Sequence, residues 1–291
     1  MHIHKKRDPF LFLAIPFAIY ALVVVVPIVS SVYYSFMDWN GITAMKFAGI
    51  SNFKKLFSDR DLLTCFTNNL KYSAVATLFQ VGGGLILAML LQQIKKGQNL
   101  LRVLLFTPTV ISGMAMSQTF KKLLAISPDG AINALLGTLG LSQLKTAFLS
   151  DMNITLYVVA IVESIRFCGL YMVVFHAAFT AIGKNVLESA AIDGAGSWQT
   201  MFHIQLPMIR GTIINCVMLA IIGTLKAFEG PFVLTNGGPG WATELMSTYI
   251  YKTAFNSSNY GYASVLSLFL VVECVLAYGV VNRLTRRKED A

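Results

Sequence analysis

The stretch ESAAIDGAGSWQTMFHIQLP, residues 188–207, lies between two long apolar segments, yet it mixes charged, small and apolar residues. Residues 186–191 favour a short helix, with Glu188 near its start, where an acidic side chain suits the helix dipole. The Asp193-Gly194 pair predicts the end of this helix, because glycine adopts a left-handed turn without steric cost. The stretch therefore begins as a helix that a glycine turn terminates.

A second short helix is expected directly after this turn. Ser197 can cap its N-terminus with the side-chain hydroxyl, and Pro207 fixes the backbone where the next apolar segment begins. The surface of such a unit is small and apolar enough to fit a groove on a partner protein, which is a common mode of helix recognition. The alternative is an interfacial hairpin that only connects two membrane spans.

The composition of the whole chain indicates a membrane protein. Of the 291 residues, 55% are hydrophobic and 13% are charged, whereas soluble domains contain about 25% charged residues. The formal net charge is +9, but the basic residues are scattered through short loops. Retention of positive charge on the inner side of a membrane explains this pattern. No basic run with interleaved aromatic residues is present, so nucleic-acid binding is not expected.

Six segments are long and apolar enough to cross a bilayer, which takes about 20 residues of helix. The first follows Lys5, Lys6 and Arg7 and is too long for a cleaved leader peptide. Pro108 is expected to bend the third. The predicted spans are residues 10–36, 72–93, 103–120, 154–179, 211–230 and 262–282. The expected fold class is an all-α polytopic membrane protein, with residues 1–291 forming one transmembrane domain.

Six spans place both termini on the same side of the membrane. Lysine and arginine are denser in the short loops on that side, which favours an N-in and C-in orientation. The outer loops are residues 37–71, 121–153 and 231–261, and each is too short for a separate domain. They contain turn signals at Asn40-Gly41, Pro128-Asp129-Gly130 and residues 236–240. The one substantial inner loop, residues 183–210, contains the opening stretch.

The spacing within the opening stretch resembles the EAA motif of the permeases of ABC importers. That motif has Glu-Ala-Ala, three further residues, Gly, nine further residues and Ile-x-Leu-Pro. The matching positions are Glu188, Ala190, Gly194, Ile204, Leu206 and Pro207. Ser189 replaces the first alanine of the motif with another small residue, and Asp193-Gly194-Ala195 looks like the carbohydrate-uptake, maltose-permease-like branch.

The resemblance extends over most of the chain and implies the fold of an ABC type I importer permease with six spans. It implies that the inner loop carries a coupling helix, which docks on a separate ATPase subunit. The coupling residues that it implies are Glu188, Ser189, Ala190, Asp193, Gly194, Ala195, Ile204, Leu206 and Pro207.

The outer segment 235–240, with the sequence TNGGPG, also resembles this branch, as do residues 249–251 and 260–264. The resemblance suggests a docking place for an extracytoplasmic solute-binding protein. Its candidate residues are Gly237, Gly238, Pro239 and Gly240. The alternative is that these residues only form a tight turn.

The same resemblance implies a complex in the cytoplasmic membrane of a bacterium or an archaeon. Its other members would be a second homologous permease, two ATPase subunits and the solute-binding protein. This chain is not expected to hydrolyse ATP, because a phosphate-binding loop requires GxxxxGK[ST] and Gly183-Lys184 is followed by Asn185. We expect no cofactor in this chain, with ATP and Mg²⁺ on the ATPase. The four cysteines include no CxxC pair, so no metal site is expected.

Ionisable residues within the predicted spans mark a candidate substrate path. A charge near the bilayer centre costs roughly 2.5–3.5 kcal/mol, so it usually faces the bundle interior or a cavity. Glu163 and Arg166 are three residues apart and share one face of span four. Lys226 and Glu229 repeat this spacing at the end of span five. The candidates for the substrate path are Glu163, Arg166, Tyr171, Lys226 and Glu229.

Aromatic side chains would complete a sugar-binding surface near Glu163, and Tyr157, Phe167 and Tyr171 are expected to supply them. The alternative is a set of structural ion pairs that lock helices together. For Lys226 and Glu229, extension of the side chains towards the outer membrane surface is a further alternative.

The leading hypothesis is the permease subunit of an ATP-driven ABC importer, which translocates a sugar or oligosaccharide that a solute-binding protein delivers. The alternative is a proton-coupled secondary transporter that uses Glu163, Glu229 or Glu273 as relays. Such transporters often contain an inverted repeat, and none is evident in this sequence. A membrane enzyme would need a motif such as HExxH or GxSxG. Neither occurs, so we expect a transporter subunit rather than an enzyme.

Overall fold

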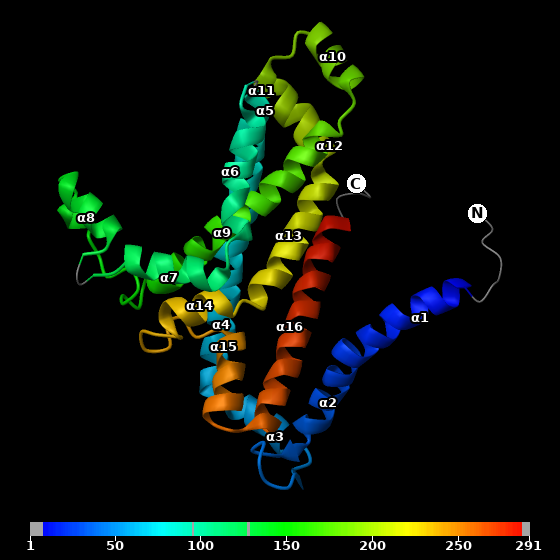
Figure 1. Cartoon of the computed structure of the whole chain (residues 1–291), viewed down its shortest axis with the longest axis vertical. Helices are drawn as coiled ribbons and strands as arrows, with labels where there is room; N and C mark the ends of the chain where they lie inside the picture. The colour runs from blue at the N-terminus through cyan, green and yellow to red at the C-terminus, as the bar shows by residue number, and fades with distance from the viewer. Residues whose placement is uncertain (1–7, 95, 127–128, 287–291) are drawn as a thin grey trace. The chain divides into compact units, whose positions relative to one another are not determined.

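The computed structural model describes residues 8–94, 96–126 and 129–286 (Figure 1). The regular secondary structure of these residues is helical, apart from a two-stranded antiparallel ribbon of β1 (Met37–Asp38) and β2 (Lys46–Phe47). Lys5, Lys6, Arg7 and Pro128 lie outside the described residues. The described residues form two compact units, residues 8–60 with 249–272 and residues 61–248 with 273–286. The prediction of one transmembrane domain stays a prediction.

The first unit contains the N-terminal candidate span, Leu13–Ser35. This span consists of α1 (Asp8–Tyr20) and α2 (Val26–Ser35), which a π-helical turn, Ala21–Val25, joins. The unit also includes α3 (Ser51–Ser58), the π-helical turn Lys252–Asn256 and the first half of α16 (Tyr260–Arg286).

The carboxylate of Asp59 connects elements of the first unit that are far apart in the sequence. Asp59 Oδ2 accepts a hydrogen bond of 2.7 Å from the Tyr249 hydroxyl and a second one from the Tyr262 hydroxyl. The ring of Trp39 packs on that of Tyr260, with 5.4 Å between the ring centroids. Because a charge-assisted hydrogen bond is stronger than a neutral one, Asp59 stabilises the packing of residues 37–60 against residues 249–262 within this unit.

The second unit contains most of the remaining helices, and α15 (Met246–Tyr251) begins in it. A π-helical turn, Leu78–Gly82, joins α4 to α5, so that Arg60–Gln93 is one candidate span. The helices are α4 (Arg60–Thr77), α5 (Gly83–Gln93), α6 (Gln98–Val110), α7 (Gly113–Leu123), α8 (Ala131–Thr138), α9 (Thr155–Thr180), α10 (Lys184–Ile192), α11 (Ser197–Thr200), α12 (Leu206–Met208), α13 (Arg210–Leu225) and α14 (Glu229–Thr235).

Four of the six predicted spans correspond to helices that are long and apolar enough to cross a membrane by themselves. They are Leu13–Ser35, Arg60–Gln93, Thr155–Thr180 and Tyr260–Arg283. The second of these starts twelve residues before the predicted position, so the end of the predicted outer loop 37–71 is helical. The boundary was missed because residues 60–71 contain charged and amide side chains within one long helix.

The third predicted span, residues 103–120, is not a single helix. Its two parts, Gln98–Val110 and Gly113–Leu123, meet at an angle of 94°. The predicted bend of this span is therefore present, but its position lies between Val110 and Gly113 rather than at Pro108, which is inside α6. The helix ends only where Ile111 and Ser112 adopt extended backbone conformations, with ψ angles of 140° and 131°.

The fifth predicted span, residues 211–230, also differs from the structure. Its main helix, α13, ends at Leu225, and a separate short helix, α14, begins at Glu229. The segment before it, Ser197–Met208, meets Arg210–Leu225 at 66°. Lys226 and Glu229 therefore do not share one helix face, and the predicted i, i+3 relation between them is wrong.

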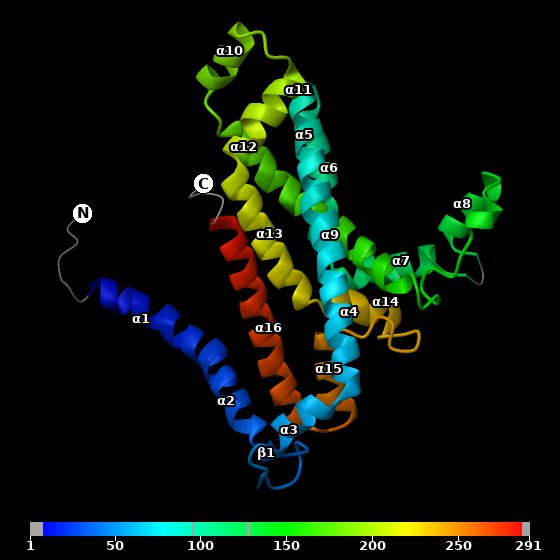
Figure 2. The same cartoon turned by 180° about the vertical axis from the view of Figure 1, so that it is seen from behind.

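Helix α9 is the centre of the second unit and packs against α5, α6 and α13 (Figure 2). One buried cluster includes Ala88, Met172, Phe175 and Ala220 from α5, α9 and α13. A second buried cluster includes Ala76, Val159, Ala160 and Leu234 from α4, α9 and α14. Small residues at these contacts let the helix backbones approach closely, which is the main source of packing energy between helices in lipid.

Gly84 marks the closest approach between α5 and α9. A Cβ atom at this position would lie 2.7 Å from Cβ of Tyr171 and 2.9 Å from the backbone nitrogen of Met172. We expect Gly84→Ala to lower the thermal denaturation midpoint of the purified protein, because overpacking against backbone atoms costs about 1–3 kcal/mol. Gly82→Ala is the matched control, since a Cβ there meets nothing within 4 Å. Equal midpoints for the two variants would contradict this account of the contact.

Candidate functional site

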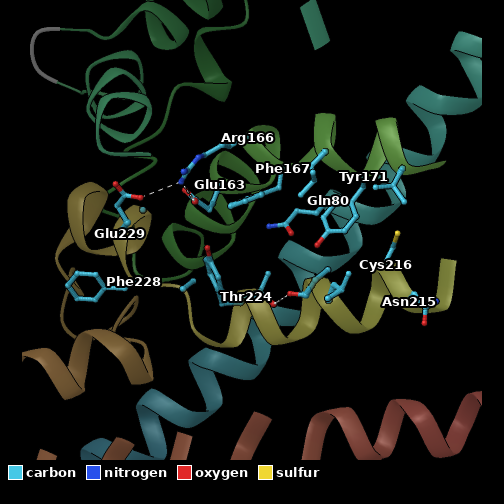
Figure 3. A pocket seen from close by; sticks show the side chains of 18 of the residues that line it. Gln80, Glu163, Arg166, Phe167, Tyr171, Asn215, Cys216, Thr224, Phe228 and Glu229 are labelled. Carbon is cyan, nitrogen blue, oxygen red and sulfur yellow. Dashed lines mark hydrogen bonds and ion pairs between the residues drawn. The ribbon is translucent and has the colours of Figure 1, made fainter. Parts of the chain in front are cut away.

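A cavity of about 790 Å³ lies in the second unit between α9, α13, the α4–α5 helix and the start of α14 (Figure 3). Its volume falls within the range of about 300–1,000 Å³ that is typical of small-molecule sites. The polar residues of its wall are Tyr72, Gln80, Glu163, Arg166, Tyr171, Thr212, Asn215, Thr224 and Glu229. The remaining lining is largely aliphatic and aromatic, so the cavity combines an apolar body with separate polar groups.

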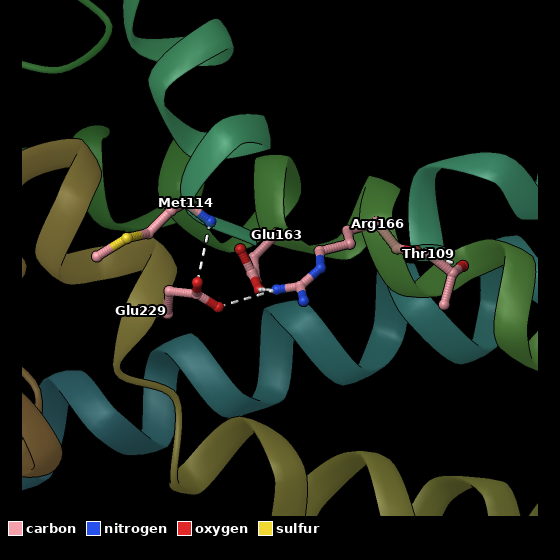
Figure 4. Close-up of polar contacts among 5 residues, drawn as sticks. All are labelled: Thr109, Met114, Glu163, Arg166 and Glu229. Atoms are coloured by element: carbon pink, nitrogen blue, oxygen red, sulfur yellow. Dashed lines mark hydrogen bonds and ion pairs between the residues drawn. The ribbon is translucent and has the colours of Figure 1, made fainter. Parts of the chain in front are cut away.

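An ionic cluster forms part of the wall of this cavity, and Figure 4 shows its contacts. Nη1 of Arg166 lies 3.2 Å from Oε1 of Glu163 on the same helix and 3.5 Å from Oε2 of Glu229. The other carboxylate oxygen of Glu229 accepts the backbone N–H of Met114 at 3.0 Å, in the first turn of α7. The break between α6 and α7 and the break between α13 and α14 therefore lie close to the same arginine, Arg166.

The cluster explains why the broken helices are tolerated. The first N–H groups of a helix have no partner within the helix and carry the positive end of its dipole, so a carboxylate stabilises them. Glu229 supplies this carboxylate to α7, and Arg166 compensates its charge. A further hydrogen bond of 2.8 Å, from the Thr109 hydroxyl to the backbone carbonyl of Arg166, fixes the end of α6 against α9.

The structure brings together four of the five residues that were predicted for the substrate path. Glu163, Arg166, Tyr171 and Glu229 all line the cavity. The fifth, Lys226, is not part of the lining, because α13 ends at Leu225 and the backbone changes direction there. A role of the four residues in substrate passage stays a prediction.

The aromatic surface of the cavity differs in part from the prediction. Phe167 and Tyr171 line it as expected, and Phe228 joins them from the segment between α13 and α14. Tyr157 was predicted to contribute, which is wrong, since its side chain is exposed on the outside of α9. Phe228 was missed because residues 211–230 were taken as one continuous span.

Gln80 is a second residue that the sequence reasoning missed. It is 3% exposed and lies in the π-helical turn between α4 and α5, with its amide pointing into the cavity (Figure 3). Turns of this kind are frequent at functional sites. The available signal was a lone amide in the middle of a charge-free apolar run, where polar residues are costly and usually functional.

The opening stretch forms two short helices around a glycine turn, as predicted. Helix α10 ends in a Schellman motif, in which the Gly194 N–H bonds the Ala191 carbonyl at 3.1 Å and the Ala195 N–H bonds the Ala190 carbonyl at 2.9 Å. Gly194 has a φ angle of +78°, which glycine adopts without strain. The predicted cap at Ser197 is wrong, because Gly196 occupies the N-cap position of α11.

The loop of residues 188–207 contains both buried and exposed apolar side chains. Ala190 is buried, whereas Ile192 is 86% exposed at the end of α10. The rings of Trp198 and Phe202 stack at 5.8 Å and are also exposed. Leu206 and Pro207 begin the short helix α12, which leads towards α13. The loop therefore presents apolar side chains at one end of the second unit, as binding in a groove would require.

The predicted turn at residues 236–240 is also present. Asn236, Gly237 and Gly240 have φ angles of 50°, 83° and 50°. The Thr243 hydroxyl donates to the Gly238 carbonyl at 2.6 Å and lies 2.7 Å from the Thr235 hydroxyl, so the loop is closed at its base. These hydrogen bonds hold residues 236–240 as a turn, in which Gly237 is buried and Asn236 and Gly240 are exposed.

Comparison with known proteins identifies the family. Residues 66–290 match the family described as "Binding-protein-dependent transport system inner membrane component". This chain belongs to that family. It is 33% identical over 272 residues to the "Probable ABC transporter permease protein YurN" of Bacillus subtilis (strain 168), with 92% of each chain covered.

Two further comparisons extend this result. The permease is 30% identical over 264 residues to the "Multiple sugar-binding transport system permease protein MsmF" of Streptococcus mutans serotype c, covering 90% of this chain and 89% of the relative. Its fold matches a chain in the crystal structure of a bacterial alginate ABC transporter in complex with an alginate pentasaccharide-bound periplasmic protein, with a TM-score of 0.82 and 23% identity. That match covers 97% of this chain and 96% of that chain and shows the type I importer permease fold.

Family membership decides between the hypotheses. The protein is the membrane-spanning permease subunit of a binding-protein-dependent ABC importer, and thus a transporter component rather than an enzyme. The proton-coupled alternative is not favoured. Of its three proposed relays, Glu163 and Glu229 share Arg166, and Glu273 accepts a hydrogen bond of 3.0 Å from the Asn69 amide. Glu229 thus connects α14 to α9 and α7, and Glu273 connects α16 to α4, whereas Glu163 pairs within α9.

Proposed function

We propose that this permease carries a sugar or an oligosaccharide across the cytoplasmic membrane of a bacterium or an archaeon. The observation that carries the proposal is the cavity between α9 and α13, in which aromatic rings lie beside neutral and charged hydrogen-bonding groups. Pyranose rings have apolar faces and polar edges, so they match such a lining. The printed name of the Streptococcus mutans relative, a multiple sugar-binding transport system permease, supports the same class of solute.

The proposal includes six spans with both termini in the cytoplasm. In this topology each bent helix pair counts as one span, which brings the four single helices to six. The breaks are then internal to the bundle, where irregular backbone is tolerated if it lines a cavity or is buried in protein. The ionic cluster of Glu163, Arg166 and Glu229 lies at the first of these breaks, between α6 and α7.

The loop of residues 183–210, here called the coupling loop, would connect the movement of two separate ATPase subunits to the spans. These subunits would bind ATP and Mg²⁺. Residues Glu188 to Ala195 would dock in a cleft of one ATPase subunit, and a second, homologous permease would engage the other. Closure of the ATPase dimer on ATP would move the two loops together and open the spans outwards. Hydrolysis would return them to the inward-open state. The Schellman motif at Gly194 supports this role, because it fixes the angle at which α10 leaves the loop.

The turn at residues 237–240 would receive the solute-binding protein on the outer face. Its closed base, formed by Thr235 and Thr243, supports a docking role because a preorganised loop loses less entropy on binding. The periplasmic protein in the alginate transporter complex is a partner of that protein, and an equivalent partner is proposed here.

Purification from the native membrane in a mild detergent tests the proposal. We expect a second permease and an ATPase to copurify, and we expect the ATP hydrolysis of the complex to rise when the saccharide-loaded solute-binding protein is added. A chain that purifies alone and transports under a proton gradient without ATP would contradict the proposal.

A further inference from the structure

The charge balance of the cavity points to a particular class of saccharide. Among the described residues, three ionisable acids and bases line it, namely Glu163, Arg166 and Glu229. Their formal charges sum to −1. The single guanidinium is already engaged, because its Nη1 atom serves both carboxylates at 3.2 and 3.5 Å. Lys226, the other cation expected near the path, does not line the cavity.

A negatively charged solute would therefore meet an excess of carboxylate. Within a site of low polarity the repulsion between like charges is stronger than in water. A solute carboxylate that paired with the unpartnered Nε of Arg166 would place three carboxylates around one guanidinium, a group of net charge −2, so negative charge would remain uncompensated. A neutral solute causes neither of these costs.

Two buried hydrogen-bonding groups in the same wall, one neutral and one cationic, have no hydrogen-bond partner among the described residues. The Tyr72 hydroxyl is buried and has no hydrogen-bond partner among the described residues, although Tyr72 lines the cavity. Nε of the Arg166 guanidinium is also buried and has no hydrogen-bond partner among the described residues. A buried polar group without a partner costs free energy, which a ligand recovers when it supplies the missing hydrogen bond. Hydroxyl groups are suited to this, because each can both donate and accept.

We propose that the cavity selects a neutral, hydroxyl-rich saccharide over an acidic one, and that Tyr72 is a specificity-determining residue that hydrogen-bonds a solute hydroxyl. Gln80 presents its amide to the same space, and Phe167, Tyr171 and Phe228 provide aromatic surface for the apolar faces of the sugar rings. This inference rests on the proposed function, since it names the class of saccharide that the same cavity takes.

The test measures binding to the permease complex in lipid nanodiscs without the solute-binding protein, so that only the selectivity of the cavity is observed. The probes are labelled neutral trisaccharides, maltotriose, raffinose and cellotriose, and a uronate of equal length, trigalacturonate, in equilibrium dialysis. We expect at least one neutral probe to bind at least tenfold more tightly than trigalacturonate. Tighter binding of the uronate would overturn the inference and leave saccharide import standing. Binding of neither class would overturn the proposed function as well.

Two variants test the residues. Tyr72→Phe removes only the hydroxyl and is expected to weaken binding of the neutral probe about tenfold, whereas Tyr157→Phe, outside the cavity, is the matched control and is expected to change nothing. Equal affinities of these two variants would remove Tyr72 from the proposal.

Glu163→Gln with Glu229→Gln changes the formal charge of the lining from −1 to +1. We expect this double variant to bind trigalacturonate at least tenfold more tightly than wild type, and an unchanged affinity would overturn the charge argument.

Discussion

Replacing Arg166 with glutamine is expected to destabilise the permease severely. Arg166 is the cation that Glu163 and Glu229 share, and the side chain of Glu163 is only 10% exposed. Removal of one partner from a buried ion pair costs about 3–5 kcal/mol, because a charge remains buried without compensation. The variant should therefore show a strongly lowered thermal denaturation midpoint and little solute uptake in reconstituted vesicles.

The control for this experiment is a variant in which the ionic cluster is uncharged although Arg166 is still absent. The triple variant Glu163→Gln, Arg166→Gln and Glu229→Gln carries no charge in the cluster and keeps side chains of similar size. We expect its denaturation midpoint to return most of the way to that of wild type, since uncharged amides can hydrogen-bond one another in place of the ion pairs. A single variant Arg166→Gln that is as stable as wild type would show that the cluster does not hold the broken helices together.

Replacing Gly194 with aspartate is expected to uncouple transport from ATP hydrolysis while the spans stay folded. The φ angle of +78° is costly for a residue with a side chain, by about 1–2 kcal/mol for most L-residues. The new carboxylate would also stand on the surface that docks with the ATPase. We expect uptake to fall by roughly tenfold or more, the factor that corresponds to ~1.4 kcal/mol, with only a small decrease in the denaturation midpoint. Glu188→Lys, on the same short helix, should act in the same direction.

The matched control is the same substitution two residues further along. Gly196 has a φ angle of −66° and occupies the N-cap of α11, where aspartate is among the preferred residues. Gly196→Asp thus adds an equal charge to the loop without backbone strain and should retain most of the uptake. If both aspartate variants transport normally, the loop is not the coupling element, and if both fail equally, charge rather than the turn is responsible.

The local features of this protein could be read from its sequence. The length of the apolar runs identified four spans correctly, because the thickness of a bilayer fixes how many residues a spanning helix needs. The spacing from Glu188 to Pro207 gave the family, and the turn at Gly194 followed from the conformational freedom of glycine. The pair of Glu163 and Arg166 was predicted because residues three apart lie on one helix face.

The remaining features depend on contacts between segments that are far apart in the chain. No sequence pattern states that Glu229 reaches both Arg166 on α9 and the first turn of α7. Hydropathy cannot distinguish a continuous span from two helices at 94°, because both have the same composition. The places of Tyr72 and Gln80 in the cavity, and the exclusion of Lys226, follow from where α13 ends and which helix faces pack together. Composition and spacing thus determined the membrane class, the family and the turn in residues 188–207, whereas packing alone decided which polar side chains share one cavity.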